Sequence, residues 1–234
     1  PQNATVIIRA HGVPLSVTRE LSRLGLRYID ATCPFVAKVH KIVAQEPPET
    51  VVLGAGDPGH PEVQGITGHC SGPFLVVQTG AELEKKVSAL ENFNKCPFIL
   101  VAQTTFNRQE WEKTVFSAKK VCTNLKIFDT ICKATVVRQE EAGELASRVD
   151  AMVVIGGRHS SNTRKLCSIC SASCPTALVE EAGELARYRE LFSQASLVGI
   201  TAGASTPVGI IKEVQETMSR MDNISNDMTF EEML

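Results

Sequence analysis

The chain has 234 residues, of which 43% are hydrophobic and 21% charged, and its formal net charge at pH 7 is −2. This composition is typical of a globular protein and excludes disorder over most of the length. The small net charge gives no bulk electrostatic basis for binding nucleic acid or an anionic membrane. No apolar run approaches the roughly 20 residues that span a bilayer. Pro1–Asn3 lacks the features of a signal peptide, so we expect a cytoplasmic protein.

Short apolar runs alternate along the chain with helical patterns. In chain order, the expected strands are Thr5–Arg9, Thr50–Leu53, Phe74–Val77, Phe98–Ala102, Leu125–Phe128, Ala151–Ile155, Thr176–Val179 and Ser196–Thr201. The expected helices include Pro14–Leu24, Pro34–Ala44, Gln109–Lys120, Gln139–Arg148, Asn162–Ser171 and Pro207–Arg220. This alternation predicts α/β units with mostly parallel sheets. Ligands of such sheets bind at the carboxyl ends of the strands.

The chain repeats itself with a period of about 100 residues. The turn Asp30–Cys33 recurs as Asp129–Cys132 (132 − 33 = 99), and the strand Val51–Gly54 recurs as Val153–Gly156 (156 − 54 = 102). The repeat divides the chain into a remnant of a first α/β unit, two further units and an acidic tail or linker, at residues 1–29, 30–128, 129–220 and 221–234. It also predicts that the first unit is incomplete, with its cysteine turn about 60–70 residues before Pro1.

The two cysteine turns are candidate metal ligands. Cys33 and Cys132 each follow a strand and precede a helix, where the helix dipole favours a thiolate. Three repeated units would bring three thiolates to one axis, which suits a zinc ion or an iron–sulfur cluster with one open iron. The alternative is that both cysteines are buried structural residues.

Polar side chains follow several of the predicted strands, and most of them open a helix. Helix N-termini rich in Ser, Thr, Asn and His bind anions such as phosphate, although each residue alone could be an N-cap. The segments are Ala10–Gly12, Gly59–Glu62, Gln103–Thr105, Ser160–Asn162 and Ala204–Thr206. Glu62 is the carboxylate of this group and a candidate proton donor; the alternative is a solvated acid at a helix terminus.

A second group of cysteines, Cys167, Cys170 and Cys174, lies outside the repeat. Its spacing, followed by Pro175, is similar to part of a ferredoxin cluster run, which would suit a small electron carrier. The same spacing places all three residues on one face of a helix, and we favour that interpretation.

The motifs taken together resemble one family. They are A-H-G-V, D-A-T-C-P-F-V-x-K-V-H, G-H-P-E-V-x-G, Q-T-T, D-x-I-C-x-A-T-x-x-R-Q, S-S-N-T-x-K-L and T-A-G-A-S-T-P, in one order from about Val6 to Arg220. In this order they resemble the LytB/IspH family of 4-hydroxy-3-methylbut-2-enyl diphosphate reductases.

The resemblance implies a trefoil of three α/β domains around a central [4Fe–4S] cluster held by three cysteines. It implies reductive removal of the allylic hydroxyl of the diphosphate substrate, which gives isopentenyl and dimethylallyl diphosphate. Cys33 and Cys132 match two cluster ligands, Glu62 matches the proton-relay acid and Thr104 lies beside it. The matching diphosphate-binding positions are His11, His60, Ser160, Ser161, Asn162 and Ser205.

The resemblance also implies what this chain lacks. The third cysteine ligand belongs to an N-terminal part of the family that is not in this sequence, so we expect this chain alone to be inactive. The expected electron donor is ferredoxin or flavodoxin, with no membrane partner. The tail Met228–Leu234 resembles the segment leading into S1-type RNA-binding domains. The alternative function is a phosphate-ester-binding protein with a structural zinc and no redox activity.

Overall fold

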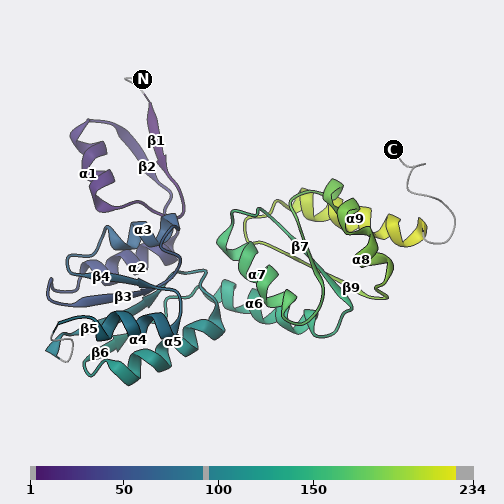
Figure 1. Cartoon of the computed structure of the whole chain (residues 1–234). Helices are drawn as coiled ribbons and strands as arrows, with labels where there is room; N and C mark the ends of the chain where they lie inside the picture. Colours follow the sequence, from purple (N-terminus) through teal and green to yellow (C-terminus); the bar gives the residue numbers. More distant parts are fainter. Residues whose placement is uncertain (1–3, 92–94, 225–234) are drawn as a thin grey trace. The chain divides into compact units, whose positions relative to one another are not determined.

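The computed structural model describes residues 4–91 and 95–224. The chain divides into two compact units, Pro1–Cys132 and Lys133–Leu234. Every strand pair in the described residues is parallel, and helices connect the strands (Figure 1). The predicted α/β class with parallel sheets is therefore confirmed. The division into repeated units at 1–29, 30–128 and 129–220 stays a prediction. The compact first unit contains both of the first two ranges.

The first unit contains a two-stranded sheet, β1-β2, and a four-stranded sheet of order β4-β3-β5-β6. Its elements in chain order are β1 (Thr5–Ile8), α1 (Leu15–Arg23), β2 (Arg27–Asp30), α2 (Pro34–Ala44), β3 (Val51–Ala55), α3 (Pro61–Thr67), β4 (Phe74–Val77), α4 (Gly80–Ser88), β5 (Phe98–Ala102), α5 (Arg108–Val121) and β6 (Leu125–Ile127).

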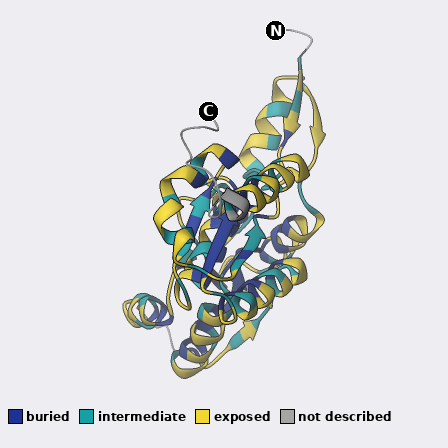
Figure 2. Cartoon of the chain, turned by 90° about the vertical axis from the view of Figure 1, so that its right-hand side faces the viewer, coloured by how far each residue is buried: buried dark blue, intermediate teal, exposed yellow. Residues whose placement is uncertain are grey.

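The two-stranded sheet is poorly covered. All four residues of β2 are exposed, and Ile7 of β1 and Ile29 of β2 expose 68% and 57% of their surface. Figure 2 shows the ribbon next to the N-terminus mostly in the yellow of exposed residues. A parallel sheet normally has both faces buried, so this pair of strands has the character of an incomplete sheet.

The four-stranded sheet holds the core of the first unit. Every residue of β3 and β5 is buried, as a central parallel strand requires. Figure 1 shows α2 and α3 on one face of this sheet and α4 and α5 on the other. On the first face, Val39 and Val43 of α2 pack with Ile66 of α3 and with the β3 and β5 side chains. The helices that carry the candidate site residues are thereby fixed to the sheet.

The second unit repeats this plan with the sheet order β8-β7-β9. Its elements are α6 (Lys133–Ala146), β7 (Ala151–Ile155), α7 (Ser161–Ser171), β8 (Thr176–Val179), the 3₁₀ helix η2 (Ala182–Tyr188), α8 (Arg189–Ser193), β9 (Val198–Ala202) and α9 (Val208–Ile224).

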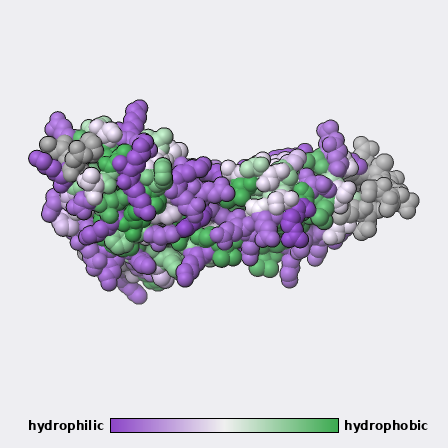
Figure 3. Space-filling view, turned by 90° about the horizontal axis from the view of Figure 1, so that it is seen from below, coloured by the Kyte–Doolittle hydropathy of each residue, from purple (hydrophilic) through white to green (hydrophobic). Residues whose placement is uncertain are grey.

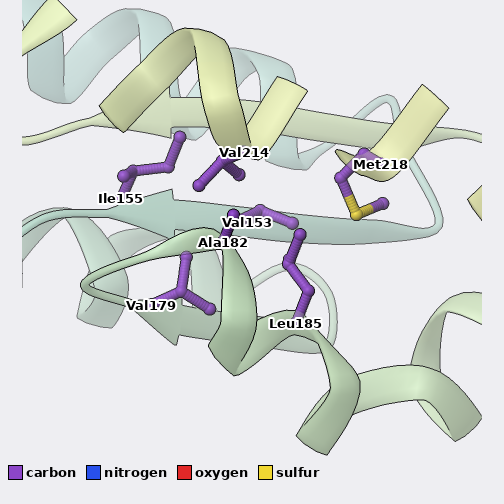
Figure 4. Packing of buried hydrophobic residues seen from close by; sticks show 7 residues of the cluster. All are labelled: Val153, Ile155, Val179, Ala182, Leu185, Val214 and Met218. Atoms are coloured by element: carbon purple, nitrogen blue, oxygen red, sulfur yellow. The ribbon is translucent and has the colours of Figure 1, made fainter. Parts of the chain in front are cut away.

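Alternate residues of β7 serve the two faces of this second sheet. Val153 and Ile155 join a cluster with residues of β8, η2 and α9, including Val214 and Met218 (Figure 4). Met152 and Val154, which alternate with these two residues along the strand, pack instead with residues of α6 and α7. The period of two along a strand produces this division.

Some predicted boundaries were wrong. The helix predicted to begin at Gln139 begins at Lys133, because buried Thr135 and Gln139 keep the first turns of α6 against the protein. The tail predicted from 221 begins too early, since α9 continues to Ile224; residues 225–234 lie outside the described part. Strand β2 has no apolar pattern to predict it, and pairing with β1 forms it.

Hydrophobic side chains also reach the surface. Figure 3 shows green hydrophobic residues among purple hydrophilic ones on the face in view. Phe116 of α5 and Val137 of α6 are 73% and 50% exposed. Among the helices of the described residues, none combines the length and the apolar character needed to cross a membrane.

The core assignment makes a stability prediction. Leu53 of β3 is fully buried, so Leu53→Ala leaves a cavity and should cost about 2–5 kcal/mol of the free energy of unfolding. The matched change Leu24→Ala, at a side chain 53% exposed, should stay within about 0.5 kcal/mol. Urea denaturation followed by circular dichroism measures both. Equal costs would contradict the core assignment.

Candidate functional site

The first cysteine turn is built by the carboxylate of Asp30. Its Oδ1 accepts hydrogen bonds from the Thr32 amide at 2.9 Å and the Thr32 hydroxyl at 2.5 Å, and these bonds lower the pKa of Asp30. Cys33 is the N-cap of α2, with Pro34 in the first turn. The Cys33 amide donates to the carbonyl of Ala10, just beyond β1, at 3.0 Å. The thiol therefore stands at a helix N-terminus beside the loop that carries His11.

The second cysteine turn has the same construction. The Asp129 carboxylate accepts from the Ile131 amide at 3.4 Å and from Arg108 Nη1 at 2.5 Å. The Cys132 amide donates to the carbonyl of Thr104, just beyond β5, at 2.9 Å, and α6 begins at the next residue. Each cysteine is thus tied to the loop after a neighbouring strand, which supports the repeat of the two turns.

A buried carboxylate joins the loops after β3 and β5. Glu62, in the first turn of α3, is 2% exposed. Its Oε1 accepts from the Thr104 amide at 2.6 Å, and its Oε2 accepts from the Thr104 hydroxyl at 2.9 Å. His60 caps α3, with its Nδ1 accepting from the Glu62 amide at 3.2 Å. Glu62 is therefore not the solvated acid that we considered as an alternative.

His11 lies against His60. The ring centroids are 5.2 Å apart in an edge-to-face arrangement with an interplanar angle of 74°. Burial, and secondarily the charge of Arg9, lowers the pKa of His11. Its Nδ1 is buried and has no hydrogen-bond partner in the described part of the chain. A buried polar atom without a partner is costly, so this nitrogen indicates a ligand or water that completes the site.

Contacts connect the two cysteine turns without a break. From the first turn they lead through the His11 loop to the cap of α3, then through the buried carboxylate to the second turn. The residues in this order are Cys33, Ala10, His11, His60, Glu62, Thr104 and Cys132. The first unit thus brings together six predicted site residues, namely Cys33, His11, His60, Glu62, Thr104 and Cys132.

The other predicted site residues lie in the second unit. Ser160 caps α7, and its hydroxyl accepts from the Thr163 amide at 3.4 Å. Ser161 and Asn162 are each 5% exposed, and neither Oδ1 nor Nδ2 of Asn162 has a hydrogen-bond partner among the described residues. Ser205 is exposed in the loop after β9. The amide and the helix N-terminus together fit an anionic ligand.

The structure corrects the register of the repeat. Gly56 and Gly156 (156 − 56 = 100) each donate an amide hydrogen bond, at 2.9 Å, to the last residue of the edge strand, Val77 or Val179. Gly54, which the sequence pattern matched to Gly156, lies inside β3 instead. Similar three-letter apolar runs made the sequence match two residues out of step.

With the corrected offset of 100, site residues of the first unit correspond to site residues of the second. The N-cap His60 corresponds to the N-cap Ser160, and the buried Glu62 corresponds to the buried Asn162. Thr105 corresponds to Ser205 in the loop after the next strand. From the sequence, Thr105 belonged to a polar segment after a predicted strand but was not among the predicted site residues. Its correspondence to Ser205 in the corrected repeat makes it a further candidate.

The second group of cysteines, Cys167, Cys170 and Cys174, belongs to the core of the second unit. Cys170 of α7 is fully buried, and burial raises its pKa to about 11. Cys167 and Cys174 pack against the same cluster as Cys170. The prediction that all three lie on one helix was wrong for Cys174, because α7 ends at Ser171. A buried, protonated thiol is a poor metal ligand, so this group does not suit a cluster.

The donor set suits a thiolate-bound cluster. Cys33 and Cys132 are free thiols, each partly exposed. Soft thiolates at helix N-termini are the ligands of iron–sulfur clusters and zinc. Within residues 4–91 and 95–224, no three His, Cys, Asp or Glu side chains converge as a metal site.

Comparison with known proteins identifies the family of this chain. The model of the LytB protein family matches residues 2–219. The 4-hydroxy-3-methylbut-2-enyl diphosphate reductase of Clostridioides difficile (strain 630) is 41% identical over 222 residues, which are 92% of this chain and 75% of that protein. The chain thus spans about three quarters of this relative.

Solved structures agree as well. The E-1-hydroxy-2-methyl-but-2-enyl-4-diphosphate reductase of Plasmodium falciparum matches 94% of this chain and 68% of its own, with 25% identity and a TM-score of 0.82. A structure of (E)-4-hydroxy-3-methyl-but-2-enyl diphosphate reductase, described as the terminal enzyme of the non-mevalonate pathway, is 38% identical with a TM-score of 0.57. It covers 92% of this chain and 76% of its own. The chain therefore belongs to the LytB protein family.

Proposed function

We propose that this chain acts in the reductive dehydroxylation of (E)-4-hydroxy-3-methylbut-2-enyl diphosphate. Two electrons and two protons break the allylic C–O bond and yield water with isopentenyl or dimethylallyl diphosphate, the last step of the methylerythritol phosphate pathway. Relatives and a solved structure with 38–41% identity carry the name of this reductase. The observation that carries the proposal is the buried Glu62, held by Thr104 between two cysteine turns.

Cys33 and Cys132 would hold a [4Fe–4S] cluster together with a third cysteine. The repeat predicts that cysteine ahead of Pro1, and the family resemblance implies the same. When bound, the cluster would pass on, one at a time, the two electrons of the external donor and would offer a Lewis-acidic iron for the allylic oxygen. The chain's own contribution is to hold each thiol at the start of a helix, in a turn whose cysteine amide is tied to the loop after a neighbouring strand.

Glu62 would deliver a proton to the leaving oxygen. Expelling hydroxide without a proton is costly, and a carboxyl in the protonated form removes that cost. The Thr104 amide and hydroxyl hold both oxygens of Glu62, so the side chain has a fixed orientation. A fixed donor keeps the proton directed at one atom of the substrate.

The diphosphate would be bound through neutral donors and imidazoles. In the first unit we propose His11 and His60, with Thr105 at the position that corresponds to Ser205. In the second unit we propose Ser160, Ser161, Asn162 and Ser205. The unpartnered polar atoms of His11 and Asn162 support this assignment, because a bound phosphate oxygen or water would satisfy them.

The electron donor and the cellular context remain family-based proposals. We propose ferredoxin or flavodoxin as the donor and the cytoplasm as the compartment. An S1-type domain after Leu234 is a further proposal, and a stop codon directly after Leu234 in the source gene would exclude it. The tail that suggests it lies outside the described residues.

Counting iron and sulfide after anaerobic reconstitution tests the function. We would compare this chain with the same chain extended upstream to its natural start. The extended form should take up about four irons, absorb broadly near ~400 nm and turn over the diphosphate, whereas this chain should load poorly. A colourless protein that binds zinc and the diphosphate would support the phosphate-ester-binding alternative instead.

Serine variants of the extended form identify the ligands. Cys132→Ser should abolish the cluster because a hydroxyl is a poor ligand for it. The matched Cys170→Ser, at a core thiol, should retain the cluster. The reverse result would point to the ferredoxin-like interpretation of Cys167, Cys170 and Cys174.

Glu62→Gln tests the proton donor. The amide has the shape of the carboxyl. Its oxygen can still accept from the Thr104 amide, and its NH2 group can donate to the Thr104 hydroxyl with that bond reversed, but it has no acidic proton to give. We expect unchanged cluster absorbance and substrate binding, with turnover lowered about 100-fold or more. The matched Glu144→Gln, at an exposed side chain of the second unit, should leave turnover unchanged. Full activity of Glu62→Gln would remove Glu62 from the reaction.

A further inference from the structure

Two histidines that the site does not use lie stacked beneath the His11 loop. The ring centroids of His40 and His69 are 4.1 Å apart with an interplanar angle of 18°. His40 belongs to α2, and His69 follows the end of α3. His40 is 8% exposed, and its Nε2 is buried with no hydrogen-bond partner in the described part of the chain.

The His40 ring fills the space between the loop and α3. A Cβ atom added at Gly12 would lie 2.4 Å from His40 Cε1. A Cβ atom added at Gly65 of α3 would lie 3.2 Å from His40 Nε2 and 3.4 Å from the carbonyl oxygen of His11. Gly12 also has a φ of +69°, which side chains rarely adopt. Gly12 is therefore required for the ring to lie this close, and the absence of a side chain at Gly65 leaves the ring in place without crowding.

His69 holds the other end of the same loop. Its Nε2 is 3.1 Å from the carbonyl oxygen of Val13, and since a carbonyl only accepts, this nitrogen donates. Two residues later the Leu15 amide donates to the carbonyl of Gly68 at 3.3 Å. The loop is thus attached to α2 through a ring and to the end of α3 through hydrogen bonds.

The stacked pair does not suit a metal. The lone pairs of imidazole lie in the ring plane, so two nearly parallel rings do not direct them at one point. Burial, with a smaller effect of His69, lowers the pKa of His40 to about 4, so the ring is neutral near pH 7. A neutral, buried, planar ring against two glycines is suited to packing.

We propose that the stacked His40–His69 pair is a positioning element that fixes the His11–Val13 loop between α2 and α3. It thereby sets the His11 imidazole against His60 in the diphosphate site. This role rests on the proposed function, and it links the two parts of the site through one helix. Cys33 caps α2, and His40 lies seven residues further along the same helix, two turns away.

The proposal predicts an effect on substrate binding more than on the chemical step. We assign His11 to the diphosphate and not to the bond that breaks. Displacing His11 should therefore weaken the binding of the ground state and of the transition state equally. His40→Ala should therefore raise KM at least about tenfold, with kcat within about threefold of the wild type. Cluster absorbance should not change.

Gly65→Ala keeps His40 and protects the test against simple unfolding. The new methyl group would press on His40 Nε2 and the His11 carbonyl, while alanine favours the helix. KM should rise as for His40→Ala, with stability retained. The matched Gly209→Ala of α9, where an added Cβ meets nothing within 4 Å, should leave KM unchanged.

Hydrogen exchange gives a readout that does not depend on activity. In the extended form, with or without a bound cluster, peptides covering residues 10–16 should exchange faster in His40→Ala and Gly65→Ala, while peptides of β3 and β5 keep wild-type rates. All of these measurements use the form extended upstream to its natural start. If its wild type has no reductase activity, the proposed function fails and the exchange result alone decides the positioning role. Wild-type exchange at residues 10–16 in both variants would overturn the proposal. So would faster exchange everywhere with loss of the cluster, because the pair would then be ordinary core.

Discussion

The carboxylate of Glu62 has almost no contact with solvent, and its two oxygens are taken up by the amide and hydroxyl of Thr104. A buried carboxylate without such partners would cost several kcal/mol. The pairing therefore constrains the loops after β3 and β5 to one relative position. His60 is held through the same helix turn, and Cys132 through the Thr104 carbonyl. The candidate site of the first unit depends on this one interaction.

The two units have similar backbones but carry different side chains at equivalent positions. The same amide-to-carbonyl bonds recur 100 residues apart (203 − 103), as in Gln103 to Ala55 and Gly203 to Ile155. The backbone positions are thereby equivalent, yet Glu62 corresponds to Asn162. One unit carries a group that can exchange a proton, and the other carries an amide that can only share hydrogen bonds. At this pair of equivalent positions, only the first unit therefore carries an acid.

Packing around glycine determines how close the elements of the first unit approach. The His40 ring lies where side chains at Gly12 and Gly65 would be, and Pro14 lies where a side chain at Gly68 would be. These contacts join the His11 loop to α2 and α3, the helices whose N-termini carry Cys33 and His60. The proposed cluster ligand, substrate histidines and proton donor of the first unit therefore belong to one packed body.

The amino-acid sequence by itself determined the strands Phe98–Ala102 and Ala151–Ile155, because continuous apolar runs have no other stable place than a buried sheet. It also determined the cysteine turns. The carboxylates of Asp30 and Asp129 each accept a hydrogen bond from the backbone amide two residues further on, directly before the cysteine. Only the tertiary structure decided that Glu62 pairs with Thr104, that Gly56 rather than Gly54 matches Gly156, and that His40 lies under the His11 loop. Those relations join segments far apart in the chain, and their geometry arises only when the elements pack.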